Sequence, residues 1–429
     1  MAVTTTNYQC PACTGPLRYS PETGKTECEY CGSVYELAEI EALYKKEEEA
    51  KAETAEQPQS DWGETADGMK TYSCPSCTAE LICDASTAAT SCPYCGTPTV
   101  VPGQFHGALK PDFVIPFRKE KEDAVAALKQ HYQKRFFLPK SFKSENHIQQ
   151  VQGVYVPFWL FDGEAEGSAE FEATKSRSYV RGEYRITETA HYAVSRSGSL
   201  AFEKIPVDAS TKMPDGHMDS IEPYDYSDLQ PFSTAYLPGF LADKFGVEET
   251  ESRRRADERS AGSLVHELEE TVVGYDTVSH LSKDVEVHHG KTQYALMPVW
   301  MLNTKWQGKD FLFAMNGQTG KLVGDLPVDQ VKFWLTFGII GVVLSVISSL
   351  LVLNFAAPGE TGMPMMIAIA ASLIIALLVC GILRSGMKNV HVGTEAAEYI
   401  TGSLSLTARQ DRYTHTTTSR VKISSNSKK

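Results

Sequence analysis

Residues 333–353 read FWLTFGIIGVVLSVISSLLVL, and residues 365–383 read MMIAIAASLIIALLVCGIL. Neither stretch contains a charged side chain, and each has the length of about 20 residues with which a helix crosses a hydrocarbon core of roughly 30 Å. Only NFAAPGETGMP separates them, and its proline and glycine residues predict a tight turn. The two stretches therefore predict a transmembrane helical hairpin whose two flanks lie on the same side of the membrane.

The charges around this hairpin predict its orientation. Lys332 precedes the first helix, Arg384 and Lys388 follow the second, and the loop between them carries no Lys or Arg. Because basic flanks stay on the cytoplasmic side, we expect a two-pass protein of the cell membrane with both termini in the cytoplasm. The first residues are polar, and this start predicts that there is no signal peptide.

Small residues repeat along both predicted helices at a spacing that places them on one helix face. Such a stripe allows two helix backbones to approach closely, so we expect the hairpin to pack on itself or on a second copy, as a homo-oligomer. The small residues are Gly338, Gly341, Ser345, Ser348, Ala368, Ser372, Ala376 and Cys380.

The segment after the hairpin, residues 384–429, is a basic tail. It holds eight basic and three acidic residues, a net charge of +5 in a chain whose formal net charge is -13. A basic segment beside a membrane suits the headgroups of anionic lipids, and the alternative is a tail that the charges merely keep soluble. The stretches YITGSLSLT (399–407) and RYTHTTTSRVKIS (412–424) are strand-like, so part of the tail is expected to be ordered.

A globular body precedes the hairpin and carries an internal similarity. Residues 151–162 read VQGVYVPFWLFD and residues 292–303 read TQYALMPVWMLN, each after a helical stretch, at 118–137 and at about 247–272. We interpret this as two α+β repeats, 111–208 and 232–327, joined by a loop at 209–231. The alternative is that two unrelated buried strands share a short Pro-x-Trp pattern. The second repeat ends in a predicted hairpin, KDFLFAMNGQTGKLVGDLP (309–327), with its turn at Asn316-Gly317.

Cysteine spacing dominates the N-terminal part of the chain. Eight of the 10 cysteines form four Cys-x-x-Cys pairs, and fourteen residues separate the two pairs of each module. Residues 1–36 hold the first module, residues 72–102 hold the second, and a charged helix with a linker fills residues 37–71. The remaining Cys83 and Cys380 are interpreted as small apolar residues of the core.

Four thiolates complete the tetrahedral shell of a zinc ion and leave no open position, so the spacing predicts two structural zinc ions. Free thiols also favour a reducing compartment, in agreement with the cytoplasmic orientation. A redox-active Cys-x-x-Cys is the alternative, and the matched pairs argue against it because a thioredoxin-like motif occurs singly. The predicted ligands are Cys10, Cys13, Cys28, Cys31, Cys74, Cys77, Cys92 and Cys95.

The stretches CPAC…CEYCG and CPSC…CPYCG resemble zinc ribbons of the transcription-factor-B type and the zinc knuckles of replication-restart helicases. Two ribbons, a body with MPVWMLNTKWQGKDFLFAMNGQTGKLVGDLP and a terminal hairpin together resemble a family of bacterial zinc-ribbon membrane proteins whose function is uncharacterised. This resemblance implies the same eight metal ligands. It does not imply helicase activity, because Met315 and Leu322 stand where a phosphate-binding loop needs Gly and Ser or Thr.

Charge argues against nucleic acid as the partner of these ribbons. Residues 8–40 hold two basic and five acidic residues, and residues 70–100 hold one basic and two acidic residues. Nonspecific affinity for nucleic acid comes mainly from cations on phosphates. The one basic cluster of the body, Arg253-Arg254-Arg255, lies among acidic residues and is interpreted as a solvated helix face. Trp159, Trp300 and Trp306 are interpreted as core residues, with a ligand groove as the alternative.

No arrangement of a nucleophile with a base is recognisable, so the sequence predicts no enzyme. We expect an α+β protein with tandem zinc ribbons of four cysteines each, a duplicated α+β body and a C-terminal transmembrane helical hairpin. Its expected function is that of a noncatalytic adaptor or scaffold, which contacts the lipid bilayer and binds a protein partner at the inner leaflet. Two alternatives stay open: a membrane-linked nucleic-acid-binding protein, and a ligand-binding receptor or enzyme that uses the duplicated body.

Overall fold

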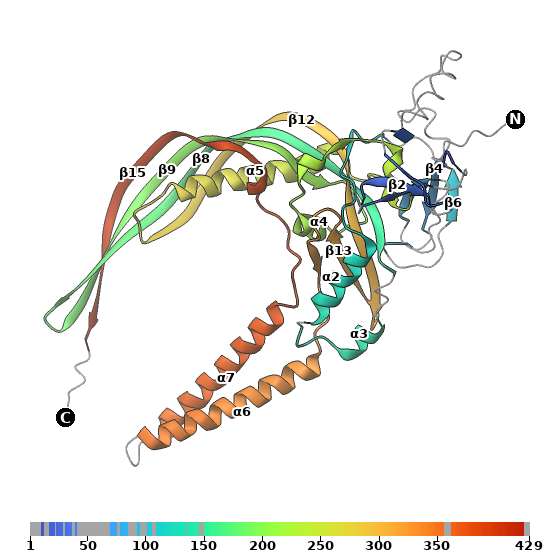
Figure 1. Cartoon of the computed structure of the whole chain (residues 1–429). Coiled ribbons are helices and arrows are strands. Elements are labelled where there is room, and N and C mark those ends of the chain that lie inside the picture. Colours follow the sequence, from blue (N-terminus) through green and yellow to red (C-terminus); the bar gives the residue numbers. More distant parts are fainter. Residues whose placement is uncertain are drawn as a thin grey trace. The chain divides into compact units, whose positions relative to one another are not determined.

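The computed structural model describes residues 10–12, 17–21, 23–28, 31–36, 39–40, 69–74, 78–84, 92–94, 101–104, 109–133, 135–145, 150–355 and 362–423. These residues form a mixed α+β fold with a large sheet, which confirms the coarse fold class (Figure 1). The chain divides into two compact units whose segments alternate along the sequence. The first unit comprises Met1–Pro157, Ser210–Lys244 and Leu296–Val392, and the second comprises Phe158–Ala209, Phe245–Ala295 and Gly393–Lys429.

The first unit contains both cysteine modules, short strands, helices of the body, the apolar helices and the ends of two long strands. The long strands β8 (Gln152–Arg181) and β12 (Thr277–Trp306) pass from one unit into the other. The other strands are β1 (Leu17–Ser20), β2 (Lys25–Cys28), β3 (Val34–Tyr35), β4 (Met69–Ser73), β5 (Glu80–Asp84), β6 (Val101–Gln104), β7 (Phe113–Val114), β10 (Gln230–Pro231), β11 (Leu241–Asp243), β13 (Lys309–Asn316) and β14 (Leu322–Gly324). The helices of the body are α2 (Lys121–Gln133), α3 (Lys140–Glu145) and α4 (Asp215–Ile221).

The two cysteine modules take different places in the sheets. The strands of the first module form a separate three-stranded antiparallel sheet of order β1-β2-β3. The strands of the second module belong to the large sheet, whose path runs β10-β7-β12-β8-β11-β5-β4-β6. The connection is the antiparallel pairing of β5 with β11, in which Ala242 lies opposite Ile82 and Asp243 opposite Leu81. The second module is therefore built into the sheet of the body.

Aromatic residues form the core of the first unit. The rings of Phe117 and Phe240 stack with their centroids 4.1 Å apart. Gly153 makes room for them, because a Cβ atom there would lie 2.5 Å from the Phe240 ring. The indole nitrogen of Trp300 donates a hydrogen bond of 2.9 Å to the carbonyl oxygen of Lys119. Trp300 is buried, as is Trp159 in the second unit, and these two assignments to the core are confirmed.

The predicted hairpin at Asn316-Gly317 is confirmed as the antiparallel pair β13 and β14. The Asn316 side chain is fully buried and holds the turn from both ends. Its Nδ2 donates to the carbonyl oxygen of Ile221 at 3.0 Å, and its Oδ1 accepts from the backbone nitrogens of Gln318 and Thr319 at 2.9 Å. An amide that satisfies three backbone groups fixes the turn against the neighbouring helix α4.

The second unit is organised around very long strands. The strand β8 pairs antiparallel with β9 (Tyr184–Asp208), and the turn between them places Gly182 at φ 63°. The far edge of β9 pairs antiparallel with β15 (Ile400–Lys422), which joins the C-terminal part of the chain to strands made much earlier (Figure 1). Residues 400–422 of the predicted basic tail are therefore an ordered strand.

The helix α5 (Glu249–Glu270) packs on β9 in this unit. It begins with acidic residues in its first turn, which favours the helix N-terminus. Its buried face includes a charged residue: Arg259 donates to the carbonyl oxygen of Pro206 at 2.7 Å and to that of Glu395 at 3.1 Å. The buried side chains recur at helical spacing and are Ser252, Ala256, Arg259, Ser260, Ser263, Leu264 and Leu268.

Two of the three arginines in the basic cluster on α5 contact neighbouring strands, whereas the sequence predicts a solvated helix face. Arg255 donates to the buried carboxylate of Asp208 at 2.9 Å, and the Arg253 guanidinium lies over the ring of Phe161 at 5.1 Å. Only Arg254 of the three is exposed. The interpretation was wrong for the other two because long arginine stems lie along apolar surface while their heads find acceptors on adjacent strands.

The compact units differ from the predicted repeats 111–208 and 232–327, because each unit takes segments from both. Strand length explains the difference: β8 and β12 have 30 residues each, whereas globular strands have roughly 5 or 6. The predicted helices at 118–137 and 247–272 correspond to α2 and α5, and each precedes one of these long strands. The duplication itself stays a prediction. The predicted charged helix and linker at 37–71 lie mostly outside the described residues.

Candidate functional site

Three cysteines of the first module gather at one point. The thiol sulfur atoms of Cys10, Cys28 and Cys31 all lie within 4.8 Å of one another, and those of Cys10 and Cys31 are 3.5 Å apart. Two thiolates bound to one zinc ion at about 2.3 Å each would be about 3.8 Å apart in tetrahedral geometry. The three thiols can therefore hold a metal ion. The fourth predicted ligand, Cys13, lies outside the described residues.

Local backbone structure explains how Cys28 and Cys31 come together. Cys28 ends β2, and its backbone nitrogen donates to the carbonyl oxygen of Ser33 at 2.9 Å. The chain then turns back, and the nitrogen of Gly32 donates to the carbonyl oxygen of Cys28 at 2.8 Å. Gly32 has φ 70°, a conformation that glycine adopts without a steric penalty. The turn forms a knuckle that directs both thiols toward Cys10.

The second module repeats this knuckle at its first cysteine pair. The nitrogen of Cys74 donates to the carbonyl oxygen of Ala79, and the nitrogen of Thr78 donates to that of Cys74, both at 2.9 Å. Thr78 has φ 57° and so takes the conformation of Gly32 in the first module. Cys74 and Cys92 are buried, and the other two predicted ligands, Cys77 and Cys95, lie outside the described residues. The shared hydrogen-bond pattern supports a common role for the two modules.

A few apolar and hydroxyl-bearing side chains surround the first thiol cluster. Leu17 and Ile40 pack with the buried Cys10 and Cys28, and Tyr35 lies against them. The Tyr35 hydroxyl lies 3.5 Å from the Cys10 sulfur, and this hydrogen bond raises the pKa of Tyr35. The Cys31 thiol lies 3.2 Å from the Ser33 hydroxyl. Modules of this length usually need a cross-link or a metal ion to fold.

A buried polar group that gives no signal in the sequence joins the second module to the body. Asp243 of β11 is 4% exposed, and its Oδ2 accepts a hydrogen bond of 2.5 Å from the Ser210 hydroxyl. Asp243 lies opposite Leu81 of β5 in the strand pairing, and Tyr94 of the module is also buried. Burial, as the main cause, raises the pKa of Asp243 to about 6. No sequence pattern marks this position, since a lone Asp after an apolar run is usually exposed.

Asp243→Asn is expected to remove a pH-dependent loss of stability. Because the pKa of Asp243 is raised from 3.8 to about 6, the folded state favours the protonated carboxyl, so stability falls as the pH rises from about 4 to above 6. The loss approaches about 3 kcal/mol at neutral pH. Denaturant unfolding at several pH values measures the free energy of unfolding of both proteins. The advantage of the variant over wild type should grow by this amount between about pH 4 and neutral pH. Asp284→Asn, which removes an exposed carboxylate, is the matched control, and an equal gain there would contradict the assignment.

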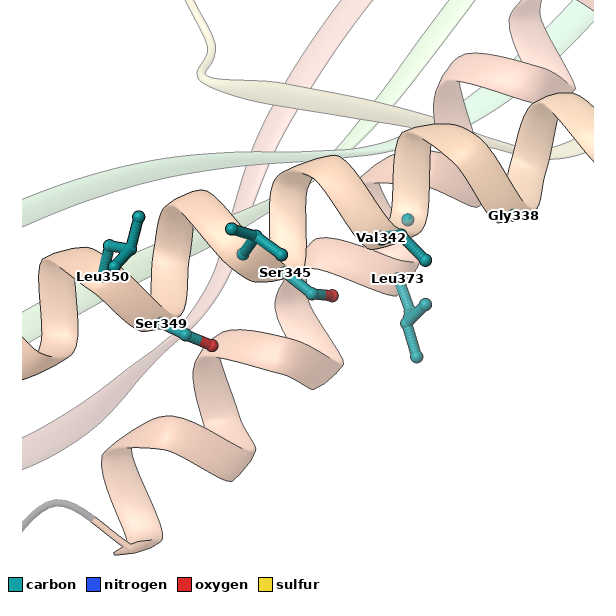
Figure 2. A pocket seen from close by; sticks show the side chains of 8 residues that line it. Gly338, Val342, Ser345, Ser349, Leu350 and Leu373 are labelled. Atoms are coloured by element: carbon teal, nitrogen blue, oxygen red, sulfur yellow. The ribbon is translucent and has the colours of Figure 1, made fainter.

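Two of the described helices are long and apolar enough to cross a membrane. These are α6 (Gln330–Phe355) and α7 (Gly362–Ser385), and only 6% and 17% of their most apolar stretches are buried within the protein. They pack on each other as predicted, with the Ser348 and Ser372 hydroxyls 3.0 Å apart. Next to this contact, small and apolar side chains of α6 line a shallow groove together with Leu373 of α7 (Figure 2).

Comparison with known proteins places the chain in a family. It is 36% identical over 326 residues to a Bacillus subtilis (strain 168) protein that carries the description "Uncharacterized protein YdjG". The alignment covers 76% of this chain and 91% of the relative. The chain belongs to the YdjG family. No family model and no solved structure matches this YdjG family member.

Proposed function

We propose that the chain is a membrane-anchored cytoplasmic adaptor whose first cysteine module, as a zinc ribbon, is the docking element for a protein partner. The observation that carries the proposal is the unequal placement of the two modules. The first has its own sheet, β1-β2-β3, whereas the second shares the sheet of the body through β11. A module with its own sheet has more of its surface available for a partner than one that extends a larger sheet.

The chemistry of the sites supports a noncatalytic role. A zinc ion with four thiolate ligands has no open coordination position for a substrate, so its contribution is to the folding of the module. The first module also offers an exposed surface, including Val34 at 49% exposure, beside the ion pair of Lys25 with Glu36 at 2.6 Å. Exposed apolar and charged groups on a rigid small scaffold are the elements of a protein-docking surface.

The helices α6 and α7 supply the proposed anchor, in a two-pass topology with cytoplasmic termini. Their outward side chains are apolar, and Trp334, at 59% exposure, stands near the start of α6 where a membrane interface is expected. The Arg384 guanidinium lies 5.8 Å from the Phe333 ring and marks the cytoplasmic end of the hairpin in this proposal. Anchoring confines the first module to the inner leaflet and raises its local concentration for membrane-bound partners.

The docking role can be tested by crosslinking in cells, followed by isolation of carbonate-washed membranes and mass spectrometry. We expect wild type to remain in the washed membranes with a defined set of crosslinked proteins. Cys28→Ser should lose this set while it remains in the membranes, because only the first module is unfolded. Cys83→Ala, which removes a buried thiol outside the four pairs, is the matched control and should keep the set. An unchanged set in Cys28→Ser would contradict docking through this module.

A further inference from the structure

The strands β8, β9 and β15 of the second unit continue side by side beyond the end of α5 (Figure 1). We call the part formed by residues 175–181, 184–190 and 416–422 the blade tip. Closer to α5, several odd-numbered residues of β8 are buried, among them Ala165, Phe171 and Ala173. In the blade tip the same face of the strand carries charged side chains in place of apolar ones.

Strand register defines the residues on this face. Across the three strands, Lys175 aligns with Ala190 and Thr416, Arg177 with Glu188 and Thr418, Tyr179 with Ile186 and Arg420, and Arg181 with Tyr184 and Lys422. Because side chains alternate between the faces of a strand, these twelve residues share one face. The face therefore has five cations and one carboxylate, a net charge of +4.

The opposite face of the blade tip has a different composition. Its rows hold Ser176 with Thr189 and Thr417, Ser178 with Thr187 and Ser419, and Val180 with Arg185 and Val421. This face has one cation, no carboxylate and a ladder of hydroxyls, in which Ser178 and Thr187 are 2.8 Å apart. The positive charge is therefore concentrated on one side of the blade tip, in a chain whose formal net charge is -13. Charges that served solubility alone would be of mixed sign and spread over both faces.

The cations of the basic face are available to a ligand. All five are exposed, and among them only Lys422 forms a direct ion pair within the described residues, with Glu183 at 3.1 Å. Strand spacing places the five within an area of about 10 Å by 20 Å. The register supplies an extended array of point charges, and such an array matches an extended polyanionic surface better than a single small anion.

We propose that the basic face of the blade tip binds the surface of an anionic lipid bilayer. The choice of a lipid surface over another polyanion rests on the proposed membrane anchoring, which keeps the chain beside the anionic cytoplasmic leaflet. Each Lys or Arg near such a surface contributes about 1 kcal/mol, so several cations together act as a second membrane contact. Tyr184, at 45% exposure, adds a side chain that suits the headgroup region.

The inference can be tested with the full chain held in nanodiscs of neutral phosphatidylcholine, mixed with vesicles that contain phosphatidylglycerol. Flotation measures how much protein moves with the vesicles. Wild type should bind anionic vesicles at about 0.1 M salt and should dissociate from them as added salt shortens the screening length. It should not bind neutral vesicles. The triple variant Lys175→Gln, Arg177→Gln, Arg181→Gln should partition roughly 100-fold more weakly.

Two further variants make the result specific. The control triple variant carries Arg254→Gln, Lys283→Gln and Lys291→Gln, which remove three exposed cations of the same unit outside the blade tip. This variant should partition onto the vesicles as wild type does. The double variant Arg420→Gln, Lys422→Gln removes two cations of the same face from strand β15. It should weaken partitioning by roughly 30-fold even if the triple variant misfolds. Equal losses in the control triple and the blade-tip triple would overturn the proposal.

The remaining outcomes separate this proposal from the proposed anchoring. If wild type enters the nanodiscs but does not bind anionic vesicles, the proposed lipid contact is overturned and the proposed anchor stands. A chain that fails to enter the nanodiscs would contradict the anchor, while its vesicle binding could still be measured in solution. Binding of a single-stranded oligonucleotide that depends on the blade tip, without binding to anionic vesicles, would replace lipid by nucleic acid as the ligand.

Discussion

Under the proposed zinc assignment, replacing Cys28 by serine is expected to release one of two zinc ions per chain and to unfold the first cysteine module. In the folded protein the Cys28 sulfur lies within 4.8 Å of those of Cys10 and Cys31, and among the described residues of the module few other side chains are buried with them. Binding of a structural zinc ion contributes on the order of 10 kcal/mol, and in small modules this is the free energy of folding. The loss of one of four thiolates therefore exceeds the stability that the remaining core supplies.

Metal analysis of the purified full chain measures this effect directly. Wild type should contain two zinc ions and Cys28→Ser one, and limited proteolysis should cut the variant only within its first module. Cys83→Ala should keep both ions, because Cys83 is a buried thiol of β5 and stands outside the Cys-x-x-Cys pairs. Zinc content that stays at the wild-type value in Cys28→Ser would show that this thiol is not a ligand.

Arg196→Ala is expected to destabilise the second unit by about 2–5 kcal/mol, the cost typical of truncating a large side chain that is fully buried. The Arg196 side chain is fully buried on β9 and donates to the Asp411 carboxylate of β15 at 2.5 Å. It also donates to the Thr271 hydroxyl, just after α5, at 3.1 Å. One side chain thus joins β9, β15 and the end of α5, and its removal leaves Asp411 without its main partner.

Denaturant unfolding compared between variants checks this value. Arg412→Ala, which removes an exposed arginine beside Asp411 on β15, is the matched control and should cost less than about 0.5 kcal/mol. Arg196→Met keeps the volume and removes the charge, so a cost for Met far below that for Ala would assign the effect to packing. Equal stability of Arg196→Ala and wild type would contradict the role of this residue.

The pH dependence of this interaction lies in the acid range. The hydrogen bond from Arg196, as the main cause, lowers the pKa of Asp411 below its usual 3.8. The stabilisation is therefore present above that ordinary value and is lost as the pH falls through the lowered one. The difference between wild type and Arg196→Ala should consequently be constant from neutral pH down to about pH 5 and shrink only in stronger acid.

Elements with strong local patterns were predictable from the sequence. The apolar runs at 333–353 and 365–383 became α6 and α7, and the Asn316-Gly317 turn became the hairpin of β13 and β14. The spacing of Cys10, Cys28 and Cys31 anticipated their gathering at one point. In each case the decisive interactions are close in sequence or depend on residue type alone, so a periodicity or a motif records them.

The long-range features left no comparable signal. Nothing in residues 400–422 indicates that they pair with β9, because a polar strand of threonines and arginines is compatible with any exposed edge. The pairing of β5 with β11 was equally hidden, and with it the different placement of the two cysteine modules. The buried Asp243 and the pairing of Arg255 with Asp208 depend on neighbours that are distant in sequence, which a charge count cannot identify.

The pairing of β15 with β9 has a consequence for the order of events during synthesis. β9 ends at Asp208, and its partner is complete only at Lys422, about two hundred residues later. At a translation rate of about 5–20 residues per second, the edge of β9 waits some 10–40 seconds for that partner. In this interval the ribosome makes both apolar helices, so α6 and α7 are complete before the second unit can close. A chain that stalls early would keep an open strand edge, whose unpaired backbone groups can pair with a strand of another chain.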